Sequence, residues 1–506
     1  MTPPTKAQIV VIGGGPAGSY AAAALQREGH EVVVLESAKF PRYHVGESLL
    51  PSMRNYLEFI DAAEDFANYG FVVKPGGAFQ IAHGATHTWT DFASAHGPDY
   101  LTWNVIRAEM DKLLLDHAAK QGVKVFEETR VESLKFTGDP ATTRPISANW
   151  VNKAGKQGSI SFDWLVDASG RAGVMSTKYL KNRHIRESLR NIAVWGYWKD
   201  AKRFGEGTVQ ANSGWFEALT DETGWAWAIP LHDGTTSIGF IMHQKYSTQK
   251  KAAKPNLLDH YLDQLQFAPG VRKLIREQGS MVDGNFVDPF FSSGVHIALT
   301  GGLAAAVTIC ASIKGEASEE LAQKWHDSKV GIAHTRFLFV VLGAYQQMQL
   351  QQHPILSDVN EENFDEAFRI YLRHCRQLDR IERREDLQLE DDAIDRFQTI
   401  FNPNISESHI KTVRSRYGAD LVNMTSAVLG AERISELAKD DEEMHQVLTR
   451  SDALKVLGDE LEATTMGRTP LHGYTANVVR GSLGLKRVAE TARMNGHTNG
   501  AVDQEV

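Results

Sequence analysis

Disulfides and metal clusters are the first features that this sequence lacks. Its 506 residues include two cysteines, Cys310 and Cys375, too few for the disulfide framework of a small secreted protein. No Cys/His cluster has the spacing of zinc ligands, so the common zinc-binding folds are excluded. The low cysteine content favours a reducing compartment, and we predict a cytoplasmic protein with no bound metal.

Long hydrophobic runs and a strong charge of one sign are missing as well. The first apolar strand is predicted from about Ile9, which leaves no room before it for a secretory signal. The run FLFVVLGAY, Phe337 to Tyr345, is shorter than the ~20 residues that span a bilayer, so we predict a core helix there. The net charge of -9 gives no broad attraction for nucleic acid or anionic lipid, and neither is predicted as a partner.

The composition is otherwise that of a globular protein with a large core. Hydrophobic residues make up 42% of the chain and charged residues 23%, which are ordinary values. We predict a nucleotide-binding core over residues 1–315, which includes a substrate-side sheet at about 185–285. A helical region is predicted over 316–490, followed by a disordered tail over 491–506.

The strongest local pattern lies near the N-terminus, where QIVVIGGGPAGSYAAAALQREGHEVVVLE reads as strand, turn, helix and strand. Gly13, Gly15 and Gly18 form GxGxxG between the first strand and the helix. These glycines allow the tight turn, the approach of a pyrophosphate and close helix–strand packing. The backbone N–H groups around Gly14 and Ala17 are expected to face the phosphates at the helix N-terminus. The prediction is an α/β Rossmann-like fold that binds a dinucleotide.

Three more distant residues bear on which dinucleotide is bound. Glu36 ends the second strand, where a carboxylate accepts hydrogen bonds from a ribose hydroxyl, and both FAD and NAD satisfy this pattern. Arg107 in RAEMD and Asp167 in DASGR resemble secondary FAD contacts of the glutathione-reductase-type flavoprotein monooxygenases. The sequence has no second GxGxxG in a βαβ context, so a separate NAD(P)H domain is not predicted. Together these features favour FAD.

Four further motifs narrow the superfamily. They are GES with Gly46, Glu47 and Ser48, KPGG with Lys74, GWAWAIP with Trp225, Trp227, Ile229 and Pro230, and FVDPFFSSGVH with Ser293 and Gly294. With these motifs, from the N-terminus to about residue 310, the chain resembles the flavin-dependent halogenases. Among them it is most similar to the fungal enzymes that chlorinate phenolic polyketides.

The resemblance implies a role for each motif. In the family, reduced FAD and O2 give a flavin hydroperoxide, which chloride attacks to form hypochlorous acid. Backbone amides at Ser293 and Gly294 are expected to hold the chloride, as successive N–H groups in a turn can. Val295 is expected to contact the flavin, and Glu47 to lie in the surroundings of the cofactor. The tryptophan motif is expected to separate the flavin from the substrate.

Lys74 is the predicted catalytic residue. The resemblance implies that its amine receives hypochlorous acid through an internal tunnel, as a chloramine or by hydrogen bonding. Burial would lower its pKa from the usual value of about 10.4 and make the neutral amine more accessible. We expect Val72 and Val73 to anchor the strand before it, and Pro75 and Gly76 to fix the turn after it.

The substrate prediction depends on a missing acid. Tryptophan halogenases carry a glutamate near the chloride-binding turn, whereas this chain has Phe290 and Phe291 there. A phenol activates its own ring, so we expect a phenolic small molecule as the substrate. The resemblance also implies a separate flavin reductase as a partner. Two alternatives remain open at this point. One is an aromatic hydroxylase of the same fold, and the other is a degenerate FAD-binding homologue, suggested by a shortened segment before Phe286 that carries Asp283 and Gly284 in reversed order.

Overall fold

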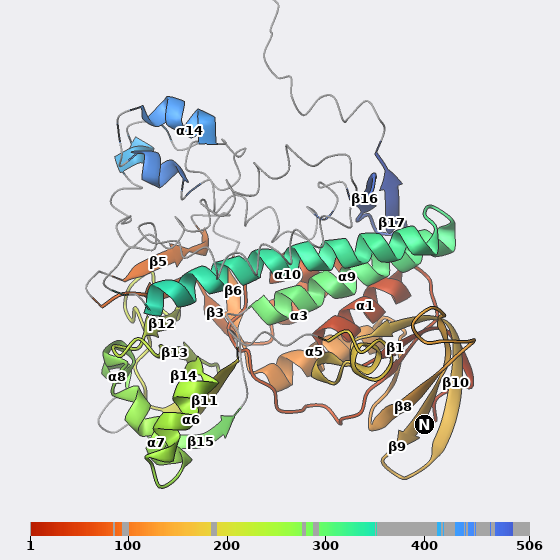
Figure 1. Ribbon diagram of the computed structural model, residues 1–506, viewed down its shortest axis with the longest axis horizontal. Coiled ribbons are helices and arrows are strands. Elements are labelled where there is room, and N and C mark those ends of the chain that lie inside the picture. The colour runs from red at the N-terminus through yellow and green to blue at the C-terminus, as the bar shows by residue number, and fades with distance from the viewer. Residues whose placement is uncertain are drawn as a thin grey trace, which may run out of the picture.

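The computed structural model has two large sheets joined by a layer of helices, and two further two-stranded sheets among its described residues (Figure 1). The described residues are 2–83, 87–93, 101–183, 190–275, 280–286, 293–349, 351, 412–415, 418, 431–439, 441, 444–449, 451, 466 and 471–488.

The six-stranded sheet confirms the predicted α/β fold. Its strands, in spatial order, are β7 (Lys124–Phe126), β2 (Val32–Leu35), β1 (Lys6–Ile12), β10 (Gln157–Asp167), β9 (Pro145–Asn152) and β8 (Thr129–Phe136). The first four strands run parallel, and the last two pairs, β10 with β9 and β9 with β8, are antiparallel. Strand β1 therefore lies inside the sheet, where its apolar residues are buried on both faces.

One face of this sheet is covered by helices α1 (Pro16–Arg27), α5 (Arg107–Lys120) and α9 (Ser293–Lys314). Helix α9 contains an apolar segment of 21 residues, long enough to cross a membrane, but 78% of its most apolar window is buried inside the protein. A Cβ at Gly302 would lie 2.7 Å from the Ala17 carbonyl oxygen, so the glycine lets α9 approach α1. The helix therefore packs as a core element, and the expectation that no apolar segment reaches the length of a membrane span was wrong for α9.

The seven-stranded sheet forms the other lobe. Its strands, in spatial order, are β15 (Ser280–Phe286), β11 (Asn191–Lys199), β14 (Thr235–His243), β13 (Gly224–Pro230), β12 (Gly214–Ala218), β4 (Gly76–Gln80) and β5 (Thr88–Asp91). All neighbours are antiparallel except β12 and β4. The sheet predicted over 185–285 is present, and it also includes β4 and β5 from a distant part of the chain.

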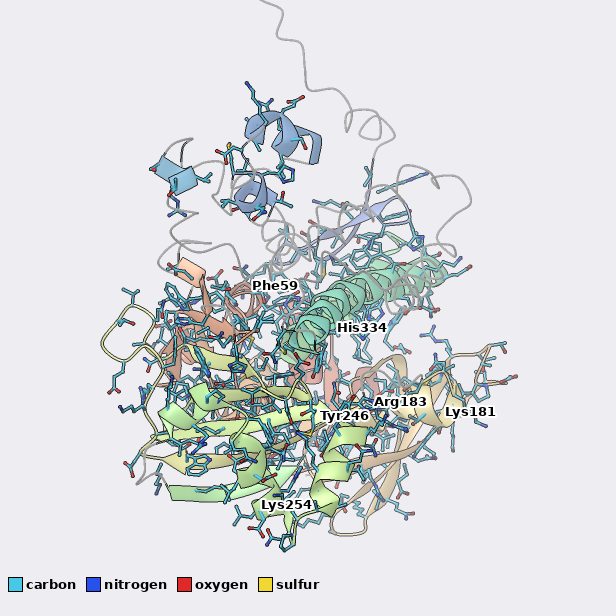
Figure 2. The ribbon with its side chains drawn as sticks, turned by 60° about the vertical axis from the view of Figure 1, so that its left-hand side comes forward. Phe59, Lys181, Arg183, Tyr246, Lys254 and His334 are labelled. Carbon is cyan, nitrogen blue, oxygen red and sulfur yellow. The ribbon has the colours of Figure 1, made fainter. Side chains whose placement is uncertain are left out.

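Each face of this second sheet packs against different elements. Helices α6 (Gln244–Ala252), α7 (Leu257–Leu265) and α8 (Pro269–Leu274) lie by one face. Figure 2 labels Tyr246 in α6 and Lys254 shortly after its end. The opposite face is aromatic and lies toward the long helix α10 (Glu319–Gln349), on which His334 is labelled. This aromatic face is the one that the site uses.

The C-terminal region is only partly described. Helices α10 and α14 (Ala431–Ala438) fall within the range predicted to be helical. A two-stranded sheet of β16 (Tyr474–Asn477) and β17 (Gly484–Arg487) was not predicted. It is held on the core because Lys314 Nζ donates to the Leu483 carbonyl oxygen at 2.7 Å. The predicted tail over 491–506 and Cys375 lie outside the described residues.

Candidate active site

The glycine-rich turn leaves no space for side chains where β1 meets α1. Gly13 has φ +102°, and a Cβ there would lie 2.3 Å from the Ala168 carbonyl oxygen. A Cβ at Gly18 would lie 1.9 Å from the Gly13 carbonyl oxygen. Helix α1 then begins at Pro16, directly after Gly15. The turn thus places backbone N–H groups at a helix N-terminus, which suits an anionic pyrophosphate.

Glu36 lies at the end of β2 with its carboxylate turned toward this loop. The Gly14 backbone N–H donates to Glu36 Oε2 at 2.6 Å, and the Ala38 N–H donates to Oε1 at 2.7 Å. The residue is 5% exposed. The carboxylate of Glu36 is therefore held in a fixed position at the glycine-rich turn. Its contact with a ribose stays a prediction.

A buried charge cluster stands beside the turn. Arg107 begins α5, and its guanidinium donates to both carboxylate oxygens of Asp111 at 2.9 and 3.2 Å. Arg42 adds a contact of 3.3 Å to the same carboxylate, and its Nη2 would lie 3.2 Å from a Cβ at Gly15. Within this cluster two cations share one anion, and the Glu36 carboxylate at the turn supplies a second anion, so the charges balance. Sequence analysis identified Arg107 but missed Arg42 and Asp111, although the i,i+4 spacing of Arg107 and Asp111 could have revealed the pair.

Asp167, at the end of β10, is engaged by its own loop. Ser169 donates to Asp167 Oδ1 through its backbone N–H at 3.1 Å and its hydroxyl at 2.5 Å. The Met175 N–H donates to Oδ2 at 2.7 Å. In this structure the carboxylate orders the segment that packs on Gly13, and its predicted contact with FAD stays a prediction.

The donor set as a whole fits a dinucleotide such as FAD. The helix N-terminus and Arg42 lie where phosphates would bind, while the fixed carboxylate of Glu36 suits a ribose. Two buried polar atoms on adjoining segments, Ser48 Oγ and Asn104 Oδ1, have no hydrogen-bond partner among the described residues. Buried polar atoms are normally paired, so their exposure to a bound ligand is a physically reasonable explanation.

Lys74 ends a short strand that is built against the GES segment. Strand β3 (Val72–Lys74) pairs with β6 (Thr102–Asn104), and Lys74 lies opposite Thr102. Beyond β6, the Leu49 N–H donates to the Trp103 carbonyl oxygen at 3.1 Å. The segment around Leu49 therefore runs as a third chain beside β6, and Lys74 Nζ reaches across to donate to the Leu49 carbonyl oxygen at 2.9 Å.

The amine of Lys74 is buried, and the described part of the chain places no counter-ion beside it. The residue is 3% exposed, and Nζ lies 5.1 Å from the centre of the Phe92 ring. Among the described residues no carboxylate pairs with it, and burial lowers its pKa to about 7. Side chains alternate along a strand, so Val72 is buried with Lys74. Val73 is 45% exposed, so the expectation that it anchors the strand was wrong.

Glu47, on the GES segment that Lys74 contacts through Leu49, is the second buried titratable group. The residue is 3% exposed, and its Oε1 accepts a hydrogen bond of 2.6 Å from the Tyr197 hydroxyl. Desolvation by burial raises its pKa to about 7, against the opposing effects of hydrogen bonds from Tyr197 and Ser237 and the charge of Arg107. That Glu47 lies in the surroundings of the cofactor stays a prediction.

The predicted chloride-binding turn lies at the start of α9, which begins at Ser293. A Cβ at Gly294 would meet no atom of the described residues within 4 Å. Val295 is buried in the core. Phe290 and Phe291, on which the substrate prediction depends, lie outside the described residues. Chloride binding at Ser293 and Gly294, and the contact of Val295 with flavin, stay predictions.

The tryptophan motif forms one face of β13. Trp225, Trp227 and Ile229 belong to the aromatic cluster, whereas Ala226 and Ala228 point to the opposite face, as a period of two requires. The Trp225 and Trp227 rings are 5.7 Å apart.

The two indole N–H groups of this motif are satisfied, because Trp225 donates to the Tyr345 hydroxyl at 3.0 Å and Trp227 to the Ser237 hydroxyl at 3.2 Å. Pro230 ends the strand and is buried. The motif is thus a rigid aromatic wall.

Asp283 and Gly284, in the segment judged to be shortened, form part of β15. In the register with β11, Asp283 lies opposite Tyr197 and Gly284 opposite Gly196. The segment is therefore the edge strand of the seven-stranded sheet.

Comparison with known proteins gives a consistent result. The family model for tryptophan halogenase matches residues 8–103 and 93–397. The chain is 47% identical over 523 residues to the flavin-dependent halogenase armH5 of Armillaria mellea, covering 96% of this chain and 99% of armH5. It is 41% identical over 537 residues to the sulochrin halogenase gedL of Aspergillus terreus, covering 98% and 95%. The solved structure of the flavin-dependent halogenase CmlS has 25% identity and a TM-score of 0.64, covering 82% of this chain and 78% of CmlS.

Proposed function

This chain belongs to the tryptophan halogenase family of flavin-dependent enzymes, and we propose that it chlorinates an electron-rich phenol of the polyketide type. Membership makes it a halogenase that depends on reduced FAD, as predicted. The observation that carries the finer proposal is the buried amine of Lys74, which has no carboxylate partner among the described residues and whose pKa burial lowers to about 7. The phenolic substrate is supported by the likeness to a sulochrin halogenase and by the aromatic residues at positions 290 and 291.

Separate groups of residues would bind the flavin, bind the chloride and separate the substrate from the flavin. The glycine turn, Glu36 and Arg107 would hold the flavin, which when reduced supplies, with O2 and chloride, the oxidised halogen species. The N-terminus of α9 at Ser293 and Gly294 would hold chloride. The wall of Trp225 and Trp227 would keep the substrate ring away from the flavin.

Lys74 would then direct the oxidised halogen, in the form of hypochlorous acid, to the substrate. With a pKa of about 7 the amine is present in both protonation states near neutrality. The ammonium can donate a hydrogen bond to the oxygen of hypochlorous acid and assist its loss as water, while the neutral amine can accept chlorine as a chloramine. In either case the ring gains chlorine and loses a proton. The rigid strand and the Leu49 carbonyl oxygen fix the position of the amine.

The direct test compares two lysine variants. Lys74→Ala should abolish chlorination of a phenolic polyketide while oxidation of reduced flavin by O2 continues. Lys135→Ala removes an exposed strand lysine and should leave both rates unchanged. Chlorination at the normal rate by Lys74→Ala would show that the assigned role is wrong.

The aromatic hydroxylase makes different demands on the assay. Reactions are supplied with FAD, a flavin reductase, NADH, O2 and either chloride or bromide, and products are examined by mass spectrometry. The proposal expects the isotope pattern of the supplied halide and no product without the reductase. An oxygenated product formed with NAD(P)H alone would instead identify a hydroxylase. Failure of flavin absorbance to appear on titration would indicate a degenerate FAD-binding homologue.

A further inference from the structure

A chain of hydroxyl groups runs from the surface to the buried carboxylate of Glu47. The Tyr197 hydroxyl donates to Glu47 Oε1 at 2.6 Å, and the Tyr43 hydroxyl lies 3.0 Å from the Tyr197 hydroxyl. Tyr43 is 51% exposed, whereas Glu47 is 3% exposed. These three residues come from two distant parts of the sequence, and the fold brings them into line.

The direction of the hydrogen bonds in this chain is fixed by counting protons. Each phenol has one proton to donate, and that of Tyr197 is used on Glu47. Tyr43 must therefore be the donor in its contact with Tyr197. The indole N–H of Trp195, which is 1% exposed, donates to the Tyr43 oxygen at 3.0 Å and holds that phenol in place. Every proton in the chain points inward toward the carboxylate.

We propose that Tyr43 and Tyr197 form a proton relay that delivers protons from solvent to Glu47. A proton from water binds the Tyr43 oxygen, the Tyr43 proton passes to Tyr197, and the Tyr197 proton passes to Glu47. Three O–H bonds form and three break, counting the one in the donor water, so both phenols end neutral. The carboxylate gains one proton, and no electron is transferred.

The reaction needs such a supply. This step of the inference rests on the proposed function. Reduced flavin, O2, chloride, one proton and the arene give oxidised flavin, the chlorinated arene and two waters, so each turnover consumes a proton. A closed site that excludes water must receive that proton through protein groups. Glu47 lies on the segment between two functional regions, because Arg107 donates to the neighbouring Val45 carbonyl oxygen at 2.8 Å and Lys74 donates to Leu49.

The electrostatic surroundings keep Glu47 able to take up and release a proton near neutrality. Tyr197 on β11 and Ser237 on β14 donate hydrogen bonds to it, and Arg107 on α5 adds a positive charge. Asp233, in the turn between β13 and β14, acts in the opposite sense. Burial outweighs these effects and raises the pKa of Glu47 to about 7. Burial also raises the pKa of Tyr197 well above its usual value, so this phenol exchanges protons without becoming an anion.

The test follows the protonation of Glu47 directly. The infrared band of its protonated carboxyl is identified by its loss in Glu47→Gln. The pH is then changed rapidly across about 7, the pKa of Glu47, and the growth of this band is timed. Tyr43→Phe leaves the Tyr197 hydrogen bond to Glu47 in place. It should therefore leave the pKa of Glu47 unchanged while slowing its protonation by on the order of tenfold or more.

Two further variants separate a relay from a structural role. Tyr197→Phe removes the direct donor, so it should both slow protonation and raise the pKa of Glu47. Tyr246→Phe removes another exposed phenol, on α6 (Figure 2), and should change neither quantity. Equal protonation rates in Tyr43→Phe and the unmodified protein would overturn the proposal, as would equal slowing by Tyr246→Phe.

The infrared experiment requires no turnover, so its failure is distinguishable from a failure of the proposed function. If the relay operates in halogenation, Tyr43→Phe also lowers kcat, increasingly so as the pH rises, with KM unchanged. A protein that never halogenates but shows the expected infrared rates would refute the proposed function and retain the relay. A fully active Tyr43→Phe variant with a slow infrared response would overturn the role of the relay in the reaction.

Discussion

Two regions of this molecule differ in how buried charge is compensated. One is the glycine turn with its neighbours, called the nucleotide side here, and the other is the region around Lys74 and Glu47. Beside the glycine turn, Arg107 and Arg42 share the carboxylate of Asp111, and Glu36 accepts hydrogen bonds from two backbone N–H groups. Around the GES segment, Lys74 on β3 contacts one carbonyl oxygen and the Phe92 ring, and Glu47 accepts a hydrogen bond from the Tyr197 hydroxyl. A compensated buried group keeps its charge, whereas a buried group without a counter-charge has its pKa shifted toward neutrality, as the proposed roles of Lys74 and Glu47 require.

The largest expected effect tests the compensated side. Asp111→Asn leaves two neighbouring guanidinium groups without their shared anion, which should cost about 3–5 kcal/mol in the free energy of unfolding and weaken flavin binding. Urea unfolding and flavin titration measure the two effects. Asp116→Asn, on the same helix, breaks an exposed pair with Lys112 and should cost less than about 1 kcal/mol. Equal losses in both variants would remove the distinction drawn here.

Lys74→Met should have the opposite sign. The pKa of Lys74 is about 7 in the folded protein and 10.5 in the unfolded chain, so the folded state binds fewer protons between these values. The stability of the unmodified protein therefore falls as the pH drops from 10.5 to 7, by up to about 1.4 kcal/mol per pH unit. Lys74→Met lacks this slope and should be the more stable protein near and below neutrality, although inactive. The exposed-lysine variant Lys135→Met should keep the slope, and a parallel pair of stability curves for Lys74→Met and the unmodified protein would contradict the prediction.

Glu47→Gln should show a smaller effect at the other end of the pH scale. The folded pKa of about 7 lies above the value of 4.5 for an unperturbed glutamate, so the folded state binds more protons between them. Stability is therefore lost as the pH rises from 4.5 through 7, and Glu47→Gln should remove that loss, on the order of 3 kcal/mol. Thermal unfolding at a series of pH values measures it. Glu132→Gln, an exposed strand residue, serves as the control and should retain the full slope.

The smallest effect returns to the nucleotide side. Glu36→Gln keeps the shape of the side chain but weakens its charge-assisted hydrogen bonds, so the affinity for FAD should fall by about tenfold. Flavin fluorescence titration provides the measurement. Glu31→Gln changes an exposed carboxylate near the start of the same strand and should bind FAD normally. Unchanged affinity in Glu36→Gln would mean that this carboxylate serves only the turn.

Local patterns in the sequence were sufficient for the nucleotide side. The glycine spacing and the strands around it predicted the βαβ unit that the structure contains, because each of its contacts joins residues close along the chain. The period of two in GWAWAIP likewise determined that Trp225 and Trp227 share a face, since side chains alternate along any strand. Family membership also followed from motifs alone, and the comparisons confirmed it.

Only the tertiary structure decided what surrounds the two buried titratable groups. Strand β3 has three residues, and its burial depends on pairing with β6 and on the segment around Leu49. The partners of Glu47 lie on β11 and β14, about 150 and 190 positions further along the chain by their residue numbers. A pKa depends on everything within a few ångströms in space, and no spacing pattern encodes neighbours that far apart. The sequence alone therefore determined which residues to examine, and the fold determined their chemistry.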